Sequence, residues 1–375
     1  MKRLLLIATL ASCASPSASV SPWNPAAPED AGFDAGAIAT LVEELRRGDH
    51  GVVDHFVLIR DGLRVVDERF DATHDEVLID QSADPPPAMY DYSDQRWHPY
   101  REGTELHTMQ STTKSVVSIA IGMAIADGAL PGVETPVLPY LQGRPIHPDP
   151  RWSDLTVADL LTMRSGLEWS PPEGTTGYTA KHPTTLMERS DAWIPFILER
   201  SMRVAPGTEF EYVDAASVLL GEVFVQAVGE RLDRYLDRRL FEPLGIDDWY
   251  WKVSPAGELD TEGGLYLTAD GLARLGQLCL DEGRWNDAQL VPAAWIAEST
   301  APHVDRLGDN TSAGYGYQWW VPHHTDGATD VYCASGFGGQ FLIVSPATRT
   351  IAVFLGWDPV AGTVMLFEPR ILGAL

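Results

Sequence analysis

Apolar and polar positions along the chain follow two different periods, and the change between them predicts the first elements. Ile38, Leu41, Val42 and Leu45 recur at helical spacing, which predicts a helix over 35–47 with Gly48 just beyond its end. Apolar runs at 55–60 and 63–66 then flank Asp61-Gly62, a dipeptide typical of two-residue hairpin turns. The chain therefore begins with a helix followed by a β-hairpin.

The middle of the chain has a mainly helical pattern. A polar, proline-containing stretch over 71–100 predicts a long loop, and 111–126 is apolar on most faces, which predicts a buried helix. Thr156 to Asp159 resembles a capping box, opening a helix that Gly166 closes, and a loop is expected from Trp169 to Thr185. Further helices are predicted over 190–199, 215–228, 232–240, 269–280 and 292–298, the last with Pro292 in its first turn.

The end of the chain returns to strand patterns and so suggests the fold class. Strands are predicted over 316–321, 331–334, 339–344 and 351–355, and a short helix over 364–372. We therefore expect an α/β (α+β) fold in which strands from both chain ends join in one antiparallel sheet flanked by helices. An all-helical domain over 106–261 would be inserted between the two parts, 27–105 and 262–375, of a discontinuous α/β domain.

The first residues are interpreted as an export signal rather than as part of the fold. Residues 1–12 have a basic start and an apolar run too short to span a bilayer, and 13–26 read as a Ser/Ala linker. Leu10 to Cys13 resembles the lipobox of bacterial lipoproteins, in which the cysteine is acylated. An ordinary secretory signal and an uncleaved apolar start are the alternatives. We expect an exported cell-envelope lipoprotein that meets the membrane only through a lipid on Cys13.

Charge and cysteine content narrow the range of partners. The 53 acidic residues outnumber the 27 basic ones, and the net charge of −26 argues against binding to nucleic acid or to anionic lipid. Cys279 and Cys333 are compatible with a disulfide or with two buried thiols, and no cysteine or histidine spacing suggests zinc. The only lysines are Lys2, Lys114, Lys181 and Lys252.

The sequence Ser111-Thr112-Thr113-Lys114 opens the most apolar helix of the chain and carries the first candidate chemistry. Residues three apart share one helix face, so the Lys114 ammonium can reach the Ser111 hydroxyl. The helix start adds free N–H groups that favour an oxyanion, and desolvation there lowers a lysine pKa. The alternative is a serine that caps the helix, with a solvated lysine one turn later.

Two further elements complete a catalytic hypothesis. Tyr212 stands just before a helix, where it can point into a cleft and act as a general base beside a lysine. Ser335-Gly336-Phe337 lies among the terminal strands, and the N–H groups of Phe337 and Ser111 would form an oxyanion hole. The alternatives are a packed aromatic with a satisfied hydroxyl and a β-bulge that bends an edge strand.

These three elements, in this order, resemble the serine β-lactamase and penicillin-binding-protein superfamily, in particular its class C-like branch of esterases and 6-aminohexanoate-oligomer hydrolases. The resemblance covers most of 27–360. Supporting stretches are Leu161–Leu167, Glu242–Ile246, Gly263–Thr268 and Tyr315–Trp320. Two positions depart from the pattern: Ala334 replaces the usual lysine of the third motif, and Asp214 replaces the usual asparagine or serine of the second. Asp214 leaves open whether Lys114 is a base or an electrostatic clamp.

The resemblance implies a serine hydrolase that cleaves ester or amide bonds of small substrates through an acyl-enzyme on Ser111, with no cofactor and no metal. The net charge of −26 separately disfavours anionic substrates and so favours neutral esters or amides. A β-lactamase or D,D-peptidase acting on cell-wall peptides is one alternative, and a non-catalytic member that binds peptide or glycan is another. Trp320 is a further aromatic near the motifs. The substrate-pocket candidates are Asp214, Ser335, Gly336, Trp169, Tyr178 and Trp319.

Overall fold

The computed structural model describes residues 22–70, 104–171, 179–304, 313–322, 331–357 and 363–375. The signal segment with Cys13, the predicted loop over 71–100 and Tyr178 lie outside the described residues. Within the described parts, no helix is both long and apolar enough to cross a bilayer.

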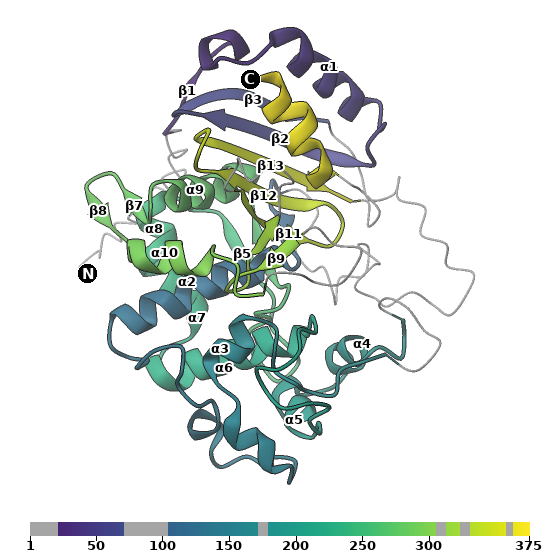
Figure 1. Ribbon diagram of the computed structural model, residues 1–375, viewed down its shortest axis with the longest axis vertical. Coiled ribbons are helices and arrows are strands. Elements are labelled where there is room, and N and C mark those ends of the chain that lie inside the picture. Colours follow the sequence, from purple (N-terminus) through teal and green to yellow (C-terminus); the bar gives the residue numbers. More distant parts are fainter. Residues whose placement is uncertain (1–21, 71–103, 172–178, 305–312, 323–330, 358–362) are drawn as a thin grey trace, which may run out of the picture.

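An eight-stranded sheet joins the two ends of the chain, as Figure 1 shows. The first hairpin pairs with the last strand in antiparallel register, Ile59 opposite Ile351, which confirms the predicted joining of distant strands. Asp61 and Gly62 both have positive φ, as a two-residue hairpin turn requires. In sheet order the strands are β1 Asn24–Pro25, β3 Leu63–Arg69, β2 Val53–Arg60, β13 Thr350–Gly356, β12 Gln340–Ser345, β11 Tyr332–Gly336, β10 Trp320–Pro322 and β9 Ala313–Tyr315.

One face of this sheet is covered by the two ends of the fold. Helix α1 (Ala35–Arg46) and the C-terminal turns over 363–374 lie on it side by side (Figure 1). Asp34 caps α1 by accepting a hydrogen bond from the N–H of Ala37, 2.9 Å away. Apolar side chains of these helices and of β2, β12 and β13 form one of two hydrophobic clusters.

The opposite face of the sheet packs on α2 (Thr112–Ala126) and α9 (Ala269–Leu280). Every side chain of α2 from Thr112 to Ala124 is buried, so the prediction of a buried helix is confirmed. The second, larger hydrophobic cluster runs from this face into the helical region, without a break at the predicted domain boundaries. The boundaries themselves stay a prediction.

The remaining helices lie beyond α2 or beside α9 (Figure 1), and the described residues also form two small sheets. The helices are α3 Val157–Leu161, α4 Pro183–Glu188, α5 Trp193–Leu198, α6 Asp214–Val228, α7 Leu232–Leu236, α8 Glu242–Leu244 and α10 Ala293–Ser299. One small sheet orders β4 His107–Thr108, β6 Leu265–Leu267 and β5 Trp249–Trp251, and the other pairs β7 Arg284–Trp285 with β8 Ala288–Gln289. Neither small sheet was predicted, because strands of two or three residues carry too little alternation to detect.

Three predicted boundaries were wrong for identifiable reasons. Helix α3 opens with the predicted capping box at Thr156 but ends at Leu161, because Met163 takes a positive φ well before Gly166. The strand predicted over 316–321 is interrupted by a turn at Gln318, whose φ is also positive. Pro292 is the residue before α10 rather than part of its first turn. Cys279 and Cys333 are buried free thiols, not a disulfide.

Candidate active site

Ser111 stands at the start of α2, directly after a residue with unusual backbone geometry. Gln110 has a φ of 46°, a conformation that few residues other than glycine adopt and that often marks functional sites. The Ser111 side chain caps no N–H of α2. Its Oγ instead accepts a hydrogen bond from Lys114 Nζ at 2.9 Å, and Lys114 is only 1% exposed. The alternative of a capping serine with a solvated lysine is therefore wrong.

The Lys114 ammonium is surrounded by hydrogen-bond acceptors and acidic groups. Besides Ser111 Oγ, its Nζ lies 2.9 Å from Asp214 Oδ1 and donates to the backbone oxygen of Glu262 at 2.6 Å. Burial by itself lowers the pKa of Lys114, but the nearby Asp214, Tyr212 and Glu262 outweigh it, so that the pKa is raised. Lys114 therefore rests as an ammonium without a lone pair, which favours the electrostatic clamp over the base.

Tyr212 completes the group, with Lys114 Nζ 5.2 Å from the centroid of its ring. Its hydroxyl is hydrogen-bonded to the side chains of both Ser111 and Lys114. Burial raises the pKa of Tyr212 above its ordinary value, although the charge of Lys114 opposes this. At neutral pH Tyr212 is a neutral phenol in contact with the Ser111 hydroxyl.

Aromatic packing and backbone hydrogen bonds hold Tyr212 in place. Its ring stacks on Trp320, with centroids 5.8 Å apart, and meets the edge of Tyr315 at 6.3 Å. The N–H of the preceding Glu211 donates to the oxygen of Met163 at 2.9 Å. Trp320 is half-buried on β10, so it contributes to the accessible side of the site.

The Ser335-Gly336-Phe337 element lies against the backbone that precedes Ser111. A Cβ at Gly336 would lie 2.3 Å from the oxygen of Met109, so only glycine fits at this contact. Phe337 follows β11 in the turn that leads to β12, and Gln340 Nε2 donates to its oxygen at 3.2 Å. Ser335 and Gly336 are thus the paired end of an interior strand and Phe337 begins the hairpin turn, so the alternative of an edge-strand bulge is wrong.

Asp214, in the first turn of α6, is held by a chain of side chains that starts at Trp169. Trp169 Nε1 donates to Thr184 Oγ1 at 3.0 Å, and Thr184 Oγ1 donates to Asp214 Oδ2 at 2.7 Å. Trp169 is 1% exposed and Trp319 is 2% exposed, so both are core residues in this structure. Ser335 is half-buried, whereas Tyr178 lies outside the described residues.

Two residues of the site, Glu262 and Gln318, were not among the site residues predicted from the sequence. Glu262 contacts Lys114 through its backbone and its carboxylate, and its position just before Gly263-Gly264 was the available hint. Gln318 links three helical segments. It accepts from Ser217 Oγ at 2.6 Å through its side chain and from Ser115 Oγ at 2.7 Å through its backbone, and its side chain donates to Leu160.

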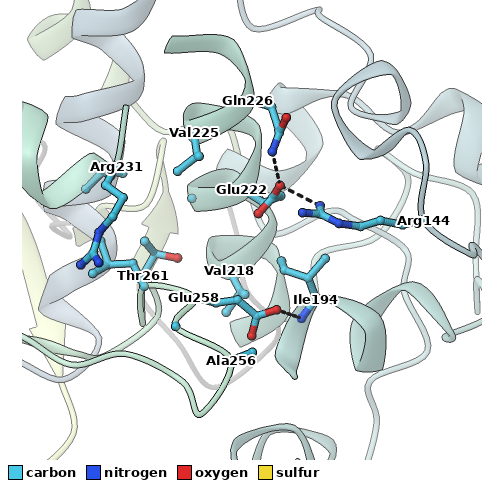
Figure 2. Close-up of a pocket in the computed structure, with 14 residues that line it drawn as sticks. Arg144, Ile194, Val218, Glu222, Val225, Gln226, Arg231, Ala256, Glu258 and Thr261 are labelled. Atoms are coloured by element: carbon cyan, nitrogen blue, oxygen red, sulfur yellow. Dashed lines mark hydrogen bonds and ion pairs between the residues drawn. The ribbon is translucent and has the colours of Figure 1, made fainter. Parts of the chain in front are cut away.

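A separate pocket of about 270 Å³ opens beside α5 and α6 and contains none of these catalytic candidates (Figure 2). Its charged side chains have partners: Arg144 lies 2.7 Å from Glu222, Arg231 lies 2.7 Å from Asp233, and Glu258 accepts from the N–H of Ile194 at 3.0 Å. Among the described residues, no group of three or more His, Cys, Asp or Glu side chains is arranged to hold a metal ion. The pocket therefore offers no chemistry comparable to that around Ser111.

Comparisons with known proteins assign this chain to a family. The sequence profile of the beta-lactamase family matches residues 40–358. The chain belongs to the beta-lactamase family. A 6-aminohexanoate-dimer hydrolase of Paenarthrobacter ureafaciens is 23% identical over 389 residues, covering 96% of this chain and 89% of that protein.

Solved structures share the fold. EstCE1, a hydrolase with promiscuous acyltransferase activity, superimposes with a TM-score of 0.65 at 16% identity, covering 90% of this chain and 98% of its own. A D-stereospecific amidohydrolase from Streptomyces sp. superimposes with a TM-score of 0.63 at 17% identity, covering 90% and 99%. The predicted fold class is confirmed.

Proposed function

We propose that this protein is a serine hydrolase that cleaves small neutral esters or amides through an acyl-enzyme on Ser111. The observation that carries the proposal is the placement of a half-buried serine hydroxyl 2.9 Å from a buried ammonium and in hydrogen bond with Tyr212. A nucleophile, a proton-transfer group and a fixed positive charge are the parts that acyl transfer requires. The named relatives act as hydrolases, which supports the same class of reaction.

The resting protonation states define how the proton moves. Ser111 Oγ attacks the carbonyl carbon, while its proton passes to the Tyr212 oxygen and the phenolic proton of Tyr212 passes to the leaving group. The bond to the leaving group breaks, and the enzyme carries an ester on Ser111. Water then attacks this ester by the reverse route, releasing the acid and restoring the serine. Tyr212 is neutral before and after each step, so its raised pKa is compatible with this role.

The negative charge of the tetrahedral intermediate is met by the start of α2. The first N–H groups of a helix have no partner within it and carry positive potential. We assign the backbone N–H groups of Ser111 and Phe337 as oxyanion donors, supported by the close approach of Gly336 to Met109. Each such donor contributes about 3 kcal/mol to lowering the barrier.

The substrate class is inferred from what the third motif lacks. Ala334 is 1% exposed and stands where the lysine that binds a substrate carboxylate is usual, so no cation is offered at that position. The net charge of −26 also disfavours anionic substrates at long range. Both features favour a neutral ester or amide over a β-lactam or a peptide with a free carboxylate.

A fluorophosphonate probe tests the proposal directly. We expect wild type to form an adduct on Ser111 and to hydrolyse p-nitrophenyl acetate or butyrate, and Ser111→Ala to do neither while remaining folded. The absence of an adduct on folded wild type, or an adduct that survives Ser111→Ala, would indicate a binding protein instead. Rapid nitrocefin turnover without ester hydrolysis would favour the β-lactamase alternative.

We also propose that the protein is exported and anchored through a lipid on Cys13, from the sequence of its first residues. Metabolic labelling with an alkyne fatty acid should tag the full chain and fail to tag Cys13→Ser. Equal labelling of wild type and Cys13→Ser would contradict a lipid anchor on Cys13.

A further inference from the structure

Glu262 contacts the Lys114 ammonium twice, once through its backbone and once through its carboxyl group. Its backbone oxygen accepts a hydrogen bond from Lys114 Nζ at 2.6 Å, and its carboxyl Oε2 lies 3.5 Å from the same atom. The side chain is 7% exposed. Its carboxyl group is also hydrogen-bonded to that of Glu188, which is buried at the end of α4.

One short helix thus supports both acidic neighbours of Lys114. On α4, Thr184 and Glu188 are four residues apart and therefore on the same face. Thr184 donates to Asp214 at 2.7 Å, and Glu188 is hydrogen-bonded to Glu262. This arrangement places the Glu188–Glu262 pair within the immediate surroundings of the catalytic ammonium.

The charged side chains around Glu262 explain why the Glu188–Glu262 pair is protonated. The buried or largely buried charged side chains from every element around Glu262 are Lys114, Lys252, Asp214, Asp260, Glu188 and Glu262. Each aspartate lies 2.9 Å from the Nζ of one lysine, so the two glutamates are the surplus acids. Two additional buried anions would carry a large desolvation cost, and protonation removes it.

The pKa directions agree with this count. Burial, followed by the charges of Asp214 and Asp260, raises the pKa of Glu262 to about 8. Burial also raises the pKa of Glu188 well above its ordinary value, and Glu262 beside it acts in the same direction. At neutral pH the pair is largely protonated, and Glu262 is the member that ionises as the solution becomes mildly alkaline.

We propose that Glu262 is a positioning residue that keeps Lys114 effective by holding a proton in its hydrogen-bonded pair with Glu188, and that its ionisation weakens the site. This rests on the proposed function. A carboxylate 3.5 Å from Lys114 Nζ would neutralise the field that stabilises charge on Ser111 and Tyr212. The same carboxylate would raise the proton affinity of Lys114. Loss of the field opposes a role of Lys114 as electrostatic clamp, and the raised proton affinity opposes a role as proton relay.

The test is the pH profile of kcat/KM for ester hydrolysis between about pH 6 and about pH 9.5, because this ratio reports ionisations of the free enzyme. In wild type we expect a basic limb with an apparent pKa of about 8, above which kcat/KM falls. In Glu262→Gln, whose amide cannot ionise, that limb is absent. In Glu188→Gln it remains, because Glu262 itself still titrates.

Glu222→Gln is the matched control, since Glu222 pairs with Arg144 on the outer side of α6, and its profile should equal that of wild type. Identical profiles for wild type and Glu262→Gln would overturn the inference while hydrolysis and Ser111 labelling leave the proposed function standing. A second readout does not need activity. The infrared C=O stretch of a protonated carboxyl should be present in wild type at neutral pH and reduced in Glu262→Gln, and no difference between the two would again overturn the inference.

Discussion

Two buried lysines of this protein form the same ion pair and have different neighbours. Lys114 Nζ lies 2.9 Å from Asp214, and Lys252 Nζ lies 2.9 Å from Asp260. In both, burial by itself lowers the pKa and the adjacent aspartate, with further acids, raises it above the ordinary value. A buried lysine–aspartate pair with a strongly perturbed pKa is therefore not sufficient evidence of catalysis.

The groups beyond the aspartate distinguish the two lysines. Lys114 also donates to the hydroxyl of Ser111 and lies against the ring of Tyr212, at the start of a helix. The aspartate of Lys252 accepts instead from the backbone N–H groups of Glu262 and Gly263, so that pair braces a loop. The group beyond the ion pair therefore distinguishes the two sites: a nucleophile candidate contacts Lys114 itself, whereas backbone N–H groups bind the aspartate of Lys252.

Replacing each lysine by methionine should give the largest difference in activity between the two sites. Lys114→Met is expected to reduce kcat/KM by on the order of 10⁴, as loss of one member of a catalytic group does. Lys252→Met is expected to reduce it by less than about tenfold while leaving Asp260 without its cation, at about 3–5 kcal/mol of stability. Ester hydrolysis and the free energy of unfolding, measured on both folded variants, check this expectation.

Lys114→Met also leaves an aspartate unpaired, so the two variants should be destabilised to a similar extent. Equal losses of turnover in two folded variants would show that both lysines act only through stability. For a variant that does not fold, the corresponding glutamine replacement keeps a hydrogen-bond donor and serves in its place.

Removing one phenolic oxygen should give the next largest effect. Tyr212→Phe is expected to lower kcat by about 10³, within the range typical of a lost proton-transfer group. Tyr235→Phe is the control, because Tyr235 on α7 donates to Asp127 at 2.7 Å, at the opposite end of α2 from Ser111, and loss of this hydrogen bond should cost about 1 kcal/mol of stability without changing kcat. A kcat for Tyr212→Phe close to that of wild type would assign the proton transfer to another group and make Lys114 the candidate.

Several parts of the site and of the fold could be predicted because their signals are local. The spacing of Ser111 and Lys114 on one helix face, the hairpin turn at Asp61-Gly62 and the capping box at Thr156 all depend on residues within four positions of each other. The aromatic neighbour of Tyr212 was harder to predict from the sequence. Trp319 and Trp320 are adjacent in the sequence, and only the tertiary structure decides that Trp320, at the start of β10, stacks on Tyr212 while Trp319 is buried.

Predictions of where helices and strands end were wrong where tertiary contacts override local conformational preference. Gln318 adopts a positive φ in the middle of a predicted strand because its side chain hydrogen-bonds to Ser217 and Leu160. No residue close to Gln318 in the sequence allows those partners to be predicted. The same holds for Glu188, which is 74 residues from Glu262 in number and hydrogen-bonded to it in space.

By itself, the sequence determined the order of the long helices, the first hairpin and the terminal strands, the acidic net charge and the residues proposed for acyl transfer, because periodicity and motif spacing depend on residues close together in the chain. The tertiary structure alone decided the protonation of those residues. Whether Lys114 is a base or a clamp depends on Asp214 and Glu262, which lie 100 and 148 residues away along the chain. Charges interact through space, and the fold determines which of them are neighbours.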